Sequence, residues 1–213
     1  MEITWYGLSC FRLAERGLAS VVTDPYPDEY GYVLPRSRAH IVTVSSRDPA
    51  RNAIKAPRGP FRILDGPGEY EIKGVFVIGV ALVGARDRDT MATRNIIFVF
   101  EYSGLTVCHL GGLNHVPSRS QIEALGTIDV LLTPVGGGDL ISAAQAAEVI
   151  SMLEPRLVIP MRYHTPRCKV KLPRANIFLK EMGVDNVESA EILQVSRSTL
   201  PQETQVLLLS PRQ

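Results

Sequence analysis

GPGEYEIKG, residues 66–74, lies at the centre of the stretch that decides the fold. FRILDG (61–66) precedes it and VFVIGVAL (75–82) follows it, with glycine at nearly every boundary. Short runs rich in β-branched and aromatic residues, separated by glycine, are typical of strands joined by tight turns. The sequence therefore predicts a β-meander over residues 61–82.

Further strands are expected on both sides of this meander. The N-terminal ones are EITWYG (2–7), CFRLAE (10–15), ASVVTD (19–24) and HIVTVSS (40–46). The C-terminal ones are NIIFVFEY (95–102), LTVCHLGG (105–112), IDVLLTPV (128–135), RLVIPMRY (156–163) and TQVLLLS (204–210). Helices are expected over 118–125 and 142–153, because Ser118 and Ser142 each stand three residues before a glutamine, as in a capping box. A third helix over 176–182 would end at Gly183.

This order, a meander followed by alternating helices and strands, predicts a mixed α/β (α+β) fold. Two sheets packed face to face, with the late helices outside, would bury the apolar faces of all these elements. No linker rich in Pro, Gly or Ser divides the chain, so we expect one domain over 1–213.

Composition limits the partners and the compartment. The net charge of +1 argues against attraction of nucleic acid over the whole surface. The basic run RYHTPRCKVKLPR (162–174) contains Tyr163 at its start but no further aromatic residues interleaved with its basic positions for base stacking, so we expect a solvated surface there. Three cysteines without a CxxC pair favour a reducing cytoplasm. No apolar run is long enough for a membrane span, and no signal peptide is evident at the N-terminus.

A family resemblance rests on motifs that follow one another in order. They are ITWYGLSCFRL (3–13), VVTDPY (21–26), IVTVSSRDPARN (41–52), DGPGEYEIKGV (65–75), CHLGGLNHVPS (108–118), DVLLTPVGGG (129–138) and PRLVIPMRYHTP (155–166). The chain resembles the short metallo-β-lactamase-fold hydrolases, the zinc-dependent group similar to ascorbate-6-phosphate lactonase. The resemblance implies an αββα sandwich of the metallo-β-lactamase fold. It also implies a zinc site in which bound water is acidified and attacks a carbonyl or phosphoryl centre.

Most of the metal ligands of that family have no counterpart here. The family's His-x-His-x-Asp-His run and its later histidine and aspartate ligands fall on Leu8, Ser46, Asp48, Ala50, Arg51, Gly112 and Arg162, and near Gly84. Of the family's residues only His115 keeps its type. Glycine and alanine donate no side-chain lone pair, and arginine stays protonated. We therefore expect no metal cofactor, and we expect Ser46, Asp48, Arg51, His115 and Arg162 to meet in the former metal pocket.

The chemistry of that pocket stays open at this point. Arg51 or Arg162 could pair with Asp48 and fill the space of the metal. The two arginines could instead grip a phosphate or carboxylate. A metal-free active site could use His115 or His164 as a base. A rearranged metal site could use His115, His164, Asp48 and Asp24.

Two functions follow from these alternatives. Missing ligands favour a protein that has lost metal binding and hydrolase activity and acts in binding or as a scaffold, for a small anionic ligand, as a homo-oligomer or with an active relative. The alternative is a zinc-dependent-hydrolase-like enzyme, of the lactonase or phosphoesterase type, with a divergent active site.

Overall fold

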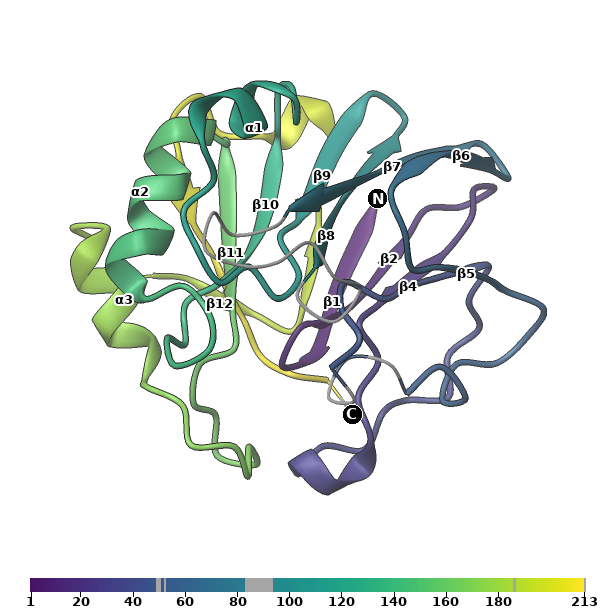
Figure 1. Cartoon of the computed structure of the whole chain (residues 1–213), viewed down its shortest axis with the longest axis horizontal. Helices are drawn as coiled ribbons and strands as arrows, with labels where there is room; N and C mark the ends of the chain where they lie inside the picture. The colour runs from purple at the N-terminus through teal and green to yellow at the C-terminus, as the bar shows by residue number, and fades with distance from the viewer. Residues whose placement is uncertain (49–50, 52, 83–93, 186, 213) are drawn as a thin grey trace.

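Two large β-sheets form the body of the molecule in the computed structural model, which describes residues 1–48, 51, 53–82, 94–185 and 187–212 (Figure 1). The first sheet has six strands in the order β13-β1-β2-β3-β4-β5. Its strands β13, β1, β2 and β3 pair antiparallel, whereas β3, β4 and β5 pair parallel. Their bounds are β1 Glu2–Gly7, β2 Cys10–Ala14, β3 Val21–Thr23, β4 Ile41–Thr43, β5 Arg62–Leu64 and β13 Ile192–Gln194.

The second sheet has seven strands in the order β14-β11-β10-β9-β8-β7-β6. Its strands β6 to β9 form an antiparallel meander, and β9, β10, β11 and β14 run parallel. The bounds are β6 Gly68–Ile72, β7 Val75–Leu82, β8 Asn95–Tyr102, β9 Leu105–His109, β10 Val130–Pro134, β11 Leu157–Met161 and β14 Gln205–Val206. A separate two-stranded pair joins β12 Ser189–Ala190 to β15 Leu208–Leu209, so the predicted last strand is divided between two sheets.

The predicted meander is wrong in one element. FRILDG forms β5, which pairs with β4 in the first sheet, and the meander continues instead into β8 and β9. The chain changes sheets between Leu64 and Gly68. The backbone N–H of Val44 donates to Leu64 O at 2.9 Å, which holds β5 beside the end of β4. Partner strands are chosen by tertiary packing, and the local pattern that predicts a strand does not specify its neighbour.

Three helices lie where they were expected: α1 Arg119–Glu123, α2 Ala143–Leu153 and α3 Ala175–Glu181. Both predicted capping boxes are present, since Ser118 and Ser142 accept from the N3 backbone while the N3 glutamine side chain accepts from the cap. Gly183 follows α3 with φ +66°, the left-handed conformation that glycine adopts without strain. The described residues also include two 3₁₀ turns, η1 Asp28–Tyr30 and η3 Arg197–Thr199.

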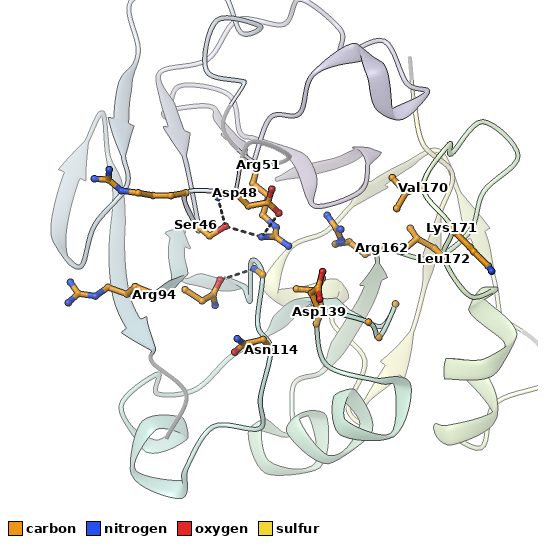
Figure 2. A pocket seen from close by; sticks show the side chains of 17 residues that line it. Ser46, Asp48, Arg51, Arg94, Asn114, Asp139, Arg162, Val170, Lys171 and Leu172 are labelled. Carbon is orange, nitrogen blue, oxygen red and sulfur yellow. Dashed lines mark hydrogen bonds and ion pairs between the residues drawn. The ribbon is translucent and has the colours of Figure 1, made fainter. Parts of the chain in front are cut away.

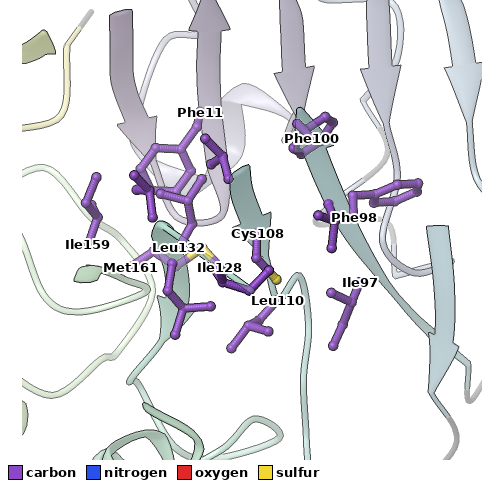
Figure 3. Close-up of a cluster of buried hydrophobic side chains, with 14 of the residues drawn as sticks. Phe11, Ile97, Phe98, Phe100, Cys108, Leu110, Ile128, Leu132, Ile159 and Met161 are labelled. Atoms are coloured by element: carbon purple, nitrogen blue, oxygen red, sulfur yellow. The ribbon is translucent and has the colours of Figure 1, made fainter. Parts of the chain in front are cut away.

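Alternation along the strands of the first sheet builds two apolar layers. Ile3, Trp5, Val21 and Ile41 point into the core between the sheets, whereas neighbours such as Val22 point to the opposite face. The central core also takes residues from the second sheet, several of which Figure 3 shows packed around Phe11. This layer holds the two sheets face to face.

The two outer faces are covered differently. In Figure 1 the helices α1, α2 and α3 lie together along the flank of the seven-stranded sheet. On the outer face of the six-stranded sheet, Tyr26, Tyr32 and Leu34 from the loop after β3 pack over Tyr6 and Val42. The sandwich of two mixed sheets with helices is confirmed, and in the described residues aromatic loops provide the cover of its second face. Among these residues no helix combines the length and apolarity needed to cross a bilayer.

Candidate functional site

A cavity of about 660 Å³ opens where parallel strands of the two sheets end. The segment after β4 contributes Ser46, the one after β9 contributes Gly112, and those after β10 and β11 contribute Gly136 and Arg162. Carboxyl ends of parallel strands are the usual place for ligand sites in open α/β sheets. The described lining residues are Ser46, Arg47, Asp48, Arg51, Arg94, Asn95, Gly112, Asn114, Gly136, Gly137, Gly138, Asp139, Leu140, Arg162, Val170, Lys171 and Leu172.

The buried carboxylate of Asp24 positions the loop that carries Ser46. Asp24 Oδ1 accepts from the backbone N–H of Ser45 at 2.7 Å, and Oδ2 accepts from Ser45 Oγ at 2.6 Å. Two bonds to one charged group are strong, because hydrogen bonds to ionised acceptors are about twice as strong as neutral ones. Asp24 thereby joins the end of β3 to the end of β4.

Arg51 fills one side of the cavity and is paired. Its Nη1 lies 3.0 Å from Asp48 Oδ2 and donates to Ser46 Oγ at 2.9 Å. The guanidinium lies against Gly112, where an added Cβ would stand 2.7 Å from Cζ of Arg51. Asn95 fixes this approach, since its Oδ1 accepts from Gly112 N at 2.8 Å. Position 112 must therefore lack a side chain for Arg51 to occupy this place.

Arg162 carries the second guanidinium of the cavity and is partly buried. Its Nε and Nη1 are buried and have no hydrogen-bond partner among the described residues. Burial, and then the nearby Arg51, lower the pKa of Arg162, while Asp48 opposes the shift. Arg162 has φ +59°, a conformation that non-glycine residues rarely adopt and that often marks functional sites. In Figure 2 the guanidinium groups of Arg51 and Arg162 point toward each other.

Basic residues outnumber acidic ones around the cavity. Among the described lining residues the acidic ones are Asp48 and Asp139, and the basic ones are Arg47, Arg51, Arg94, Arg162 and Lys171. Sequence reasoning had not placed Arg47, Arg94, Asp139 or Lys171 in the site. Lys171 belongs to the basic run (162–174) that was expected to be solvated surface. The density of positive charge in that run was the sequence signal that could have placed Lys171 at the cavity.

Four of the five candidate site residues meet in the cavity: Ser46, Asp48, Arg51 and Arg162. His115 does not line it, and its Nδ1 donates to Asn114 Oδ1 at 2.7 Å. His164 is exposed and also lies outside the lining. The hypothesis of a base in this cavity from either histidine therefore has no geometric support. Positions 50 and 84 lie outside the described residues.

The described lining residues do not fit a metal ion in the family's manner. In the part of the chain that the structure describes, no three His, Cys, Asp or Glu side chains form a group that could hold one. The Arg51 guanidinium covers Gly112, where the resemblance places a bridging aspartate, and Arg162 stands where it places a histidine. Guanidinium groups donate hydrogen bonds and offer no lone pair to a cation.

Comparison with known proteins gives a consistent family. The β-lactamase superfamily domain model matches residues 2–162. A crystal structure of a candidate Zn-dependent hydrolase of the metallo-β-lactamase superfamily from Thermotoga maritima is 38% identical, with a TM-score of 0.80 over 98% of this chain and 97% of that one. A UPF0173 protein of Pyrococcus furiosus is 26% identical over 78% of this chain and 84% of its own length. A UPF0173 metal-dependent hydrolase of Pyrococcus abyssi is 32% identical over 46% of this chain and 44% of its own.

These comparisons correct the prediction of no metal cofactor. Similar proteins are named metal-dependent hydrolases, and the Thermotoga protein is described as a candidate Zn-dependent hydrolase, so the prediction is wrong. The same names favour the hydrolase alternative over a loss of activity. The resemblance to metallo-β-lactamase-fold hydrolases is confirmed at the level of the superfamily domain.

Proposed function

This chain belongs to the metallo-β-lactamase superfamily, because the β-lactamase superfamily domain model matches residues 2–162. We propose that it is a hydrolase with a divergent active site. Its substrate carries a phosphate or carboxylate group, which Arg51 and Arg162 hold in the cavity at the strand ends. The bond that is cleaved is an ester or lactone bond of that substrate. The relatives named metal-dependent hydrolases support the reaction class.

One observation carries the assignment of an anionic substrate: the buried Nε and Nη1 of Arg162, which lack a partner in the described residues. A buried donor without an acceptor costs about 1–3 kcal/mol, and more when it is charged. The cost is larger still beside the guanidinium of Arg51, because like charges repel each other. An oxyanion bound at this place would remove both penalties.

The neighbouring groups suit recognition of such an anion. Arginine presents parallel N–H groups that match two oxygens of a carboxylate or phosphate. Arg51 is held in position by Asp48 and Ser46, so it loses little freedom when a ligand binds. Its Nε is also buried without a partner among the described residues and is a further donor. The two arginines thus bind and orient the substrate.

A substrate panel tests the proposal. Purified protein is assayed, with and without added Zn²⁺ or Mn²⁺, on aryl phosphates, phosphorylated lactones and lactones that carry a carboxylate, each beside its uncharged analogue. We expect hydrolysis of anionic members only, and an at least tenfold loss of kcat/KM in Arg162→Gln. Arg119→Gln is the matched control, because Arg119 is exposed and pairs with Glu123 on α1.

Two results would count against this function. Equal turnover of charged and uncharged analogues, unaffected by Arg162→Gln, would remove the anion site from the mechanism. Binding of the anionic compounds without turnover under any metal condition would leave a binding protein in place of a hydrolase.

A further inference from the structure

A second cavity of about 420 Å³ adjoins the first. Both cavities are lined by Ser46, Arg47 and Arg94, so they meet at these residues. The second cavity differs in character, because five apolar residues line it: Val44, Ile54, Ile63, Pro67 and Ile96.

The walls of the second cavity come from elements that are firmly held. Val44 follows β4, and its backbone N–H donates to Leu64 O at 2.9 Å. Ile96 lies on β8, and its backbone N–H donates to Ser45 O at 2.7 Å. Both side chains are buried, so this wall has a fixed shape. A preformed apolar wall binds an apolar group without the entropy cost of ordering the protein.

Ile63 leaves apolar surface uncovered at this cavity. It lies on β5 and keeps 43% of its surface exposed, whereas its neighbour Leu64 is buried in the core between the sheets. Among the described residues only Val33, Ile63 and Ile177 are large hydrophobic residues with this degree of exposure. Covering Ile63 with an apolar ligand group would remove that surface from water.

Charge sets the direction in which a ligand would lie. Asp65 lines the second cavity and would repel an anionic group placed deep within it. Arg47 and Arg94 stand at the junction of the two cavities, and Arg51 and Arg162 stand in the first. The anionic end of a ligand therefore belongs in the first cavity and its uncharged end in the second.

We propose that the two cavities form one site for an amphiphilic small molecule, in which a phosphate or carboxylate head lies between Arg51 and Arg162 and an alkyl or aryl part lies against Val44, Ile63 and Ile96. The anionic end of this proposal rests on the proposed function. The apolar end is new and defines the substrate class. A cavity of this size holds a small hydrocarbon group and is too small for a peptide helix.

A homologous series of ligands tests the apolar end. Binding of methyl, butyl, hexyl and octyl phosphate to the full-length protein is measured by isothermal titration calorimetry. Each buried methylene contributes about 0.8 kcal/mol, so the affinity should rise up to about fourfold per methylene until the second cavity is full. Inorganic phosphate is the reference for the head group alone.

Matched variants separate the two cavities. Ile63→Glu should abolish the gain with chain length and leave methyl phosphate affinity within twofold of the wild type, which also shows that the variant is folded. Ile63→Ala should reduce the gain. Ile177→Glu, at a similarly exposed isoleucine on α3, should change nothing. Arg162→Gln should weaken all four phosphates by the same factor.

The outcomes distinguish the proposed apolar end of the site from the anion site of the proposed function. Equal affinity for all four chain lengths would overturn the amphiphile proposal, while measurable binding that depends on Arg162 would still support the anion site. A gain with chain length that survives Ile63→Glu would place the alkyl group elsewhere and also overturn it. Failure of every phosphate to bind would defeat the anion site itself.

Discussion

Replacement of Arg162 by glycine should stabilise the protein while it destroys anion binding. Arg162 adopts φ +59°, and a non-glycine residue in such a conformation costs roughly 1 kcal/mol or more. Its buried Nε and Nη1 have no partner in the described residues, and each such group costs about 1–3 kcal/mol. Glycine removes these penalties, but it destabilises the folded protein by about 0.5–1 kcal/mol because it loses more backbone freedom on folding. The net gain should be about 2 kcal/mol when each penalty takes its smallest value and the entropy cost its largest.

Thermal unfolding measures this gain. For a domain of this size 1 kcal/mol shifts Tm by about 2–4 °C, so Arg162→Gly should raise Tm by about 4–8 °C in phosphate-free buffer. Phosphate at a hundred times its Kd should stabilise the wild type by about 2.7 kcal/mol and leave the variant unchanged. Stability and binding would then change in opposite directions, as is common at functional sites.

Lys73→Gly is the matched control for the backbone contribution. Lys73 is exposed and has φ +46°, so its replacement relieves backbone strain without removing a buried charge. Its Tm should change by less than about 2 °C, since strain relief and added unfolded-state entropy nearly cancel. Destabilisation of Arg162→Gly relative to Lys73→Gly, with no phosphate effect in the wild type, would refute the reasoning. Arg162 would then be a structural residue whose guanidinium stabilises the fold.

Three further predictions concern groups around the cavity. Gly112→Ala should cost about 1–3 kcal/mol because its Cβ would stand 2.7 Å from Arg51, and Arg51→Ala should relieve most of that cost in a urea double-mutant cycle; additive effects would contradict the contact. Asp24→Ala should cost about 3 kcal/mol or more by urea unfolding, because Ser45 loses two hydrogen bonds to a buried carboxylate; a cost under 1 kcal/mol would speak against this clamp. Burial lowers the pKa of His109 in the folded protein below its ordinary value of 6.5. As pH falls below 6.5, the unfolded chain therefore takes up a proton on His109 before the folded chain does. The folded state, fully favoured above pH 6.5, loses stability as pH decreases further. His109→Gln should flatten this slope, measured by urea unfolding between pH 7 and 5, by up to about 1.4 kcal/mol per pH unit, and an unchanged slope would assign the titration to other groups.

Much of the secondary structure could be predicted because its causes are local. The helices α1 and α2 begin where Ser118 and Ser142 stand three residues before a glutamine, and both capping boxes form as expected. Glycine-bounded apolar runs became strands for the same reason. The resemblance carried by GPGEYEIKG and PVGGG gave the two-sheet sandwich and directed attention to Ser46, Asp48, Arg51 and Arg162.

The sequence by itself therefore determined most of the helices and strands, the sandwich and four residues of the candidate site, but not β12 and β13. Only the tertiary structure decided that β5 joins the first sheet and that Arg51 forms the ion pair with Asp48 and lies against Gly112. It also decided that Nε and Nη1 of Arg162 have no hydrogen-bond partner in the described residues. The physical reason is the range of the interactions. Caps and turns depend on residues three or four positions apart. The cavity instead depends on which strand ends meet, because Arg51 lies against Gly112, 61 positions away, and shares the cavity with Arg162, 111 positions away, so the sequence alone left open which arginine pairs with Asp48.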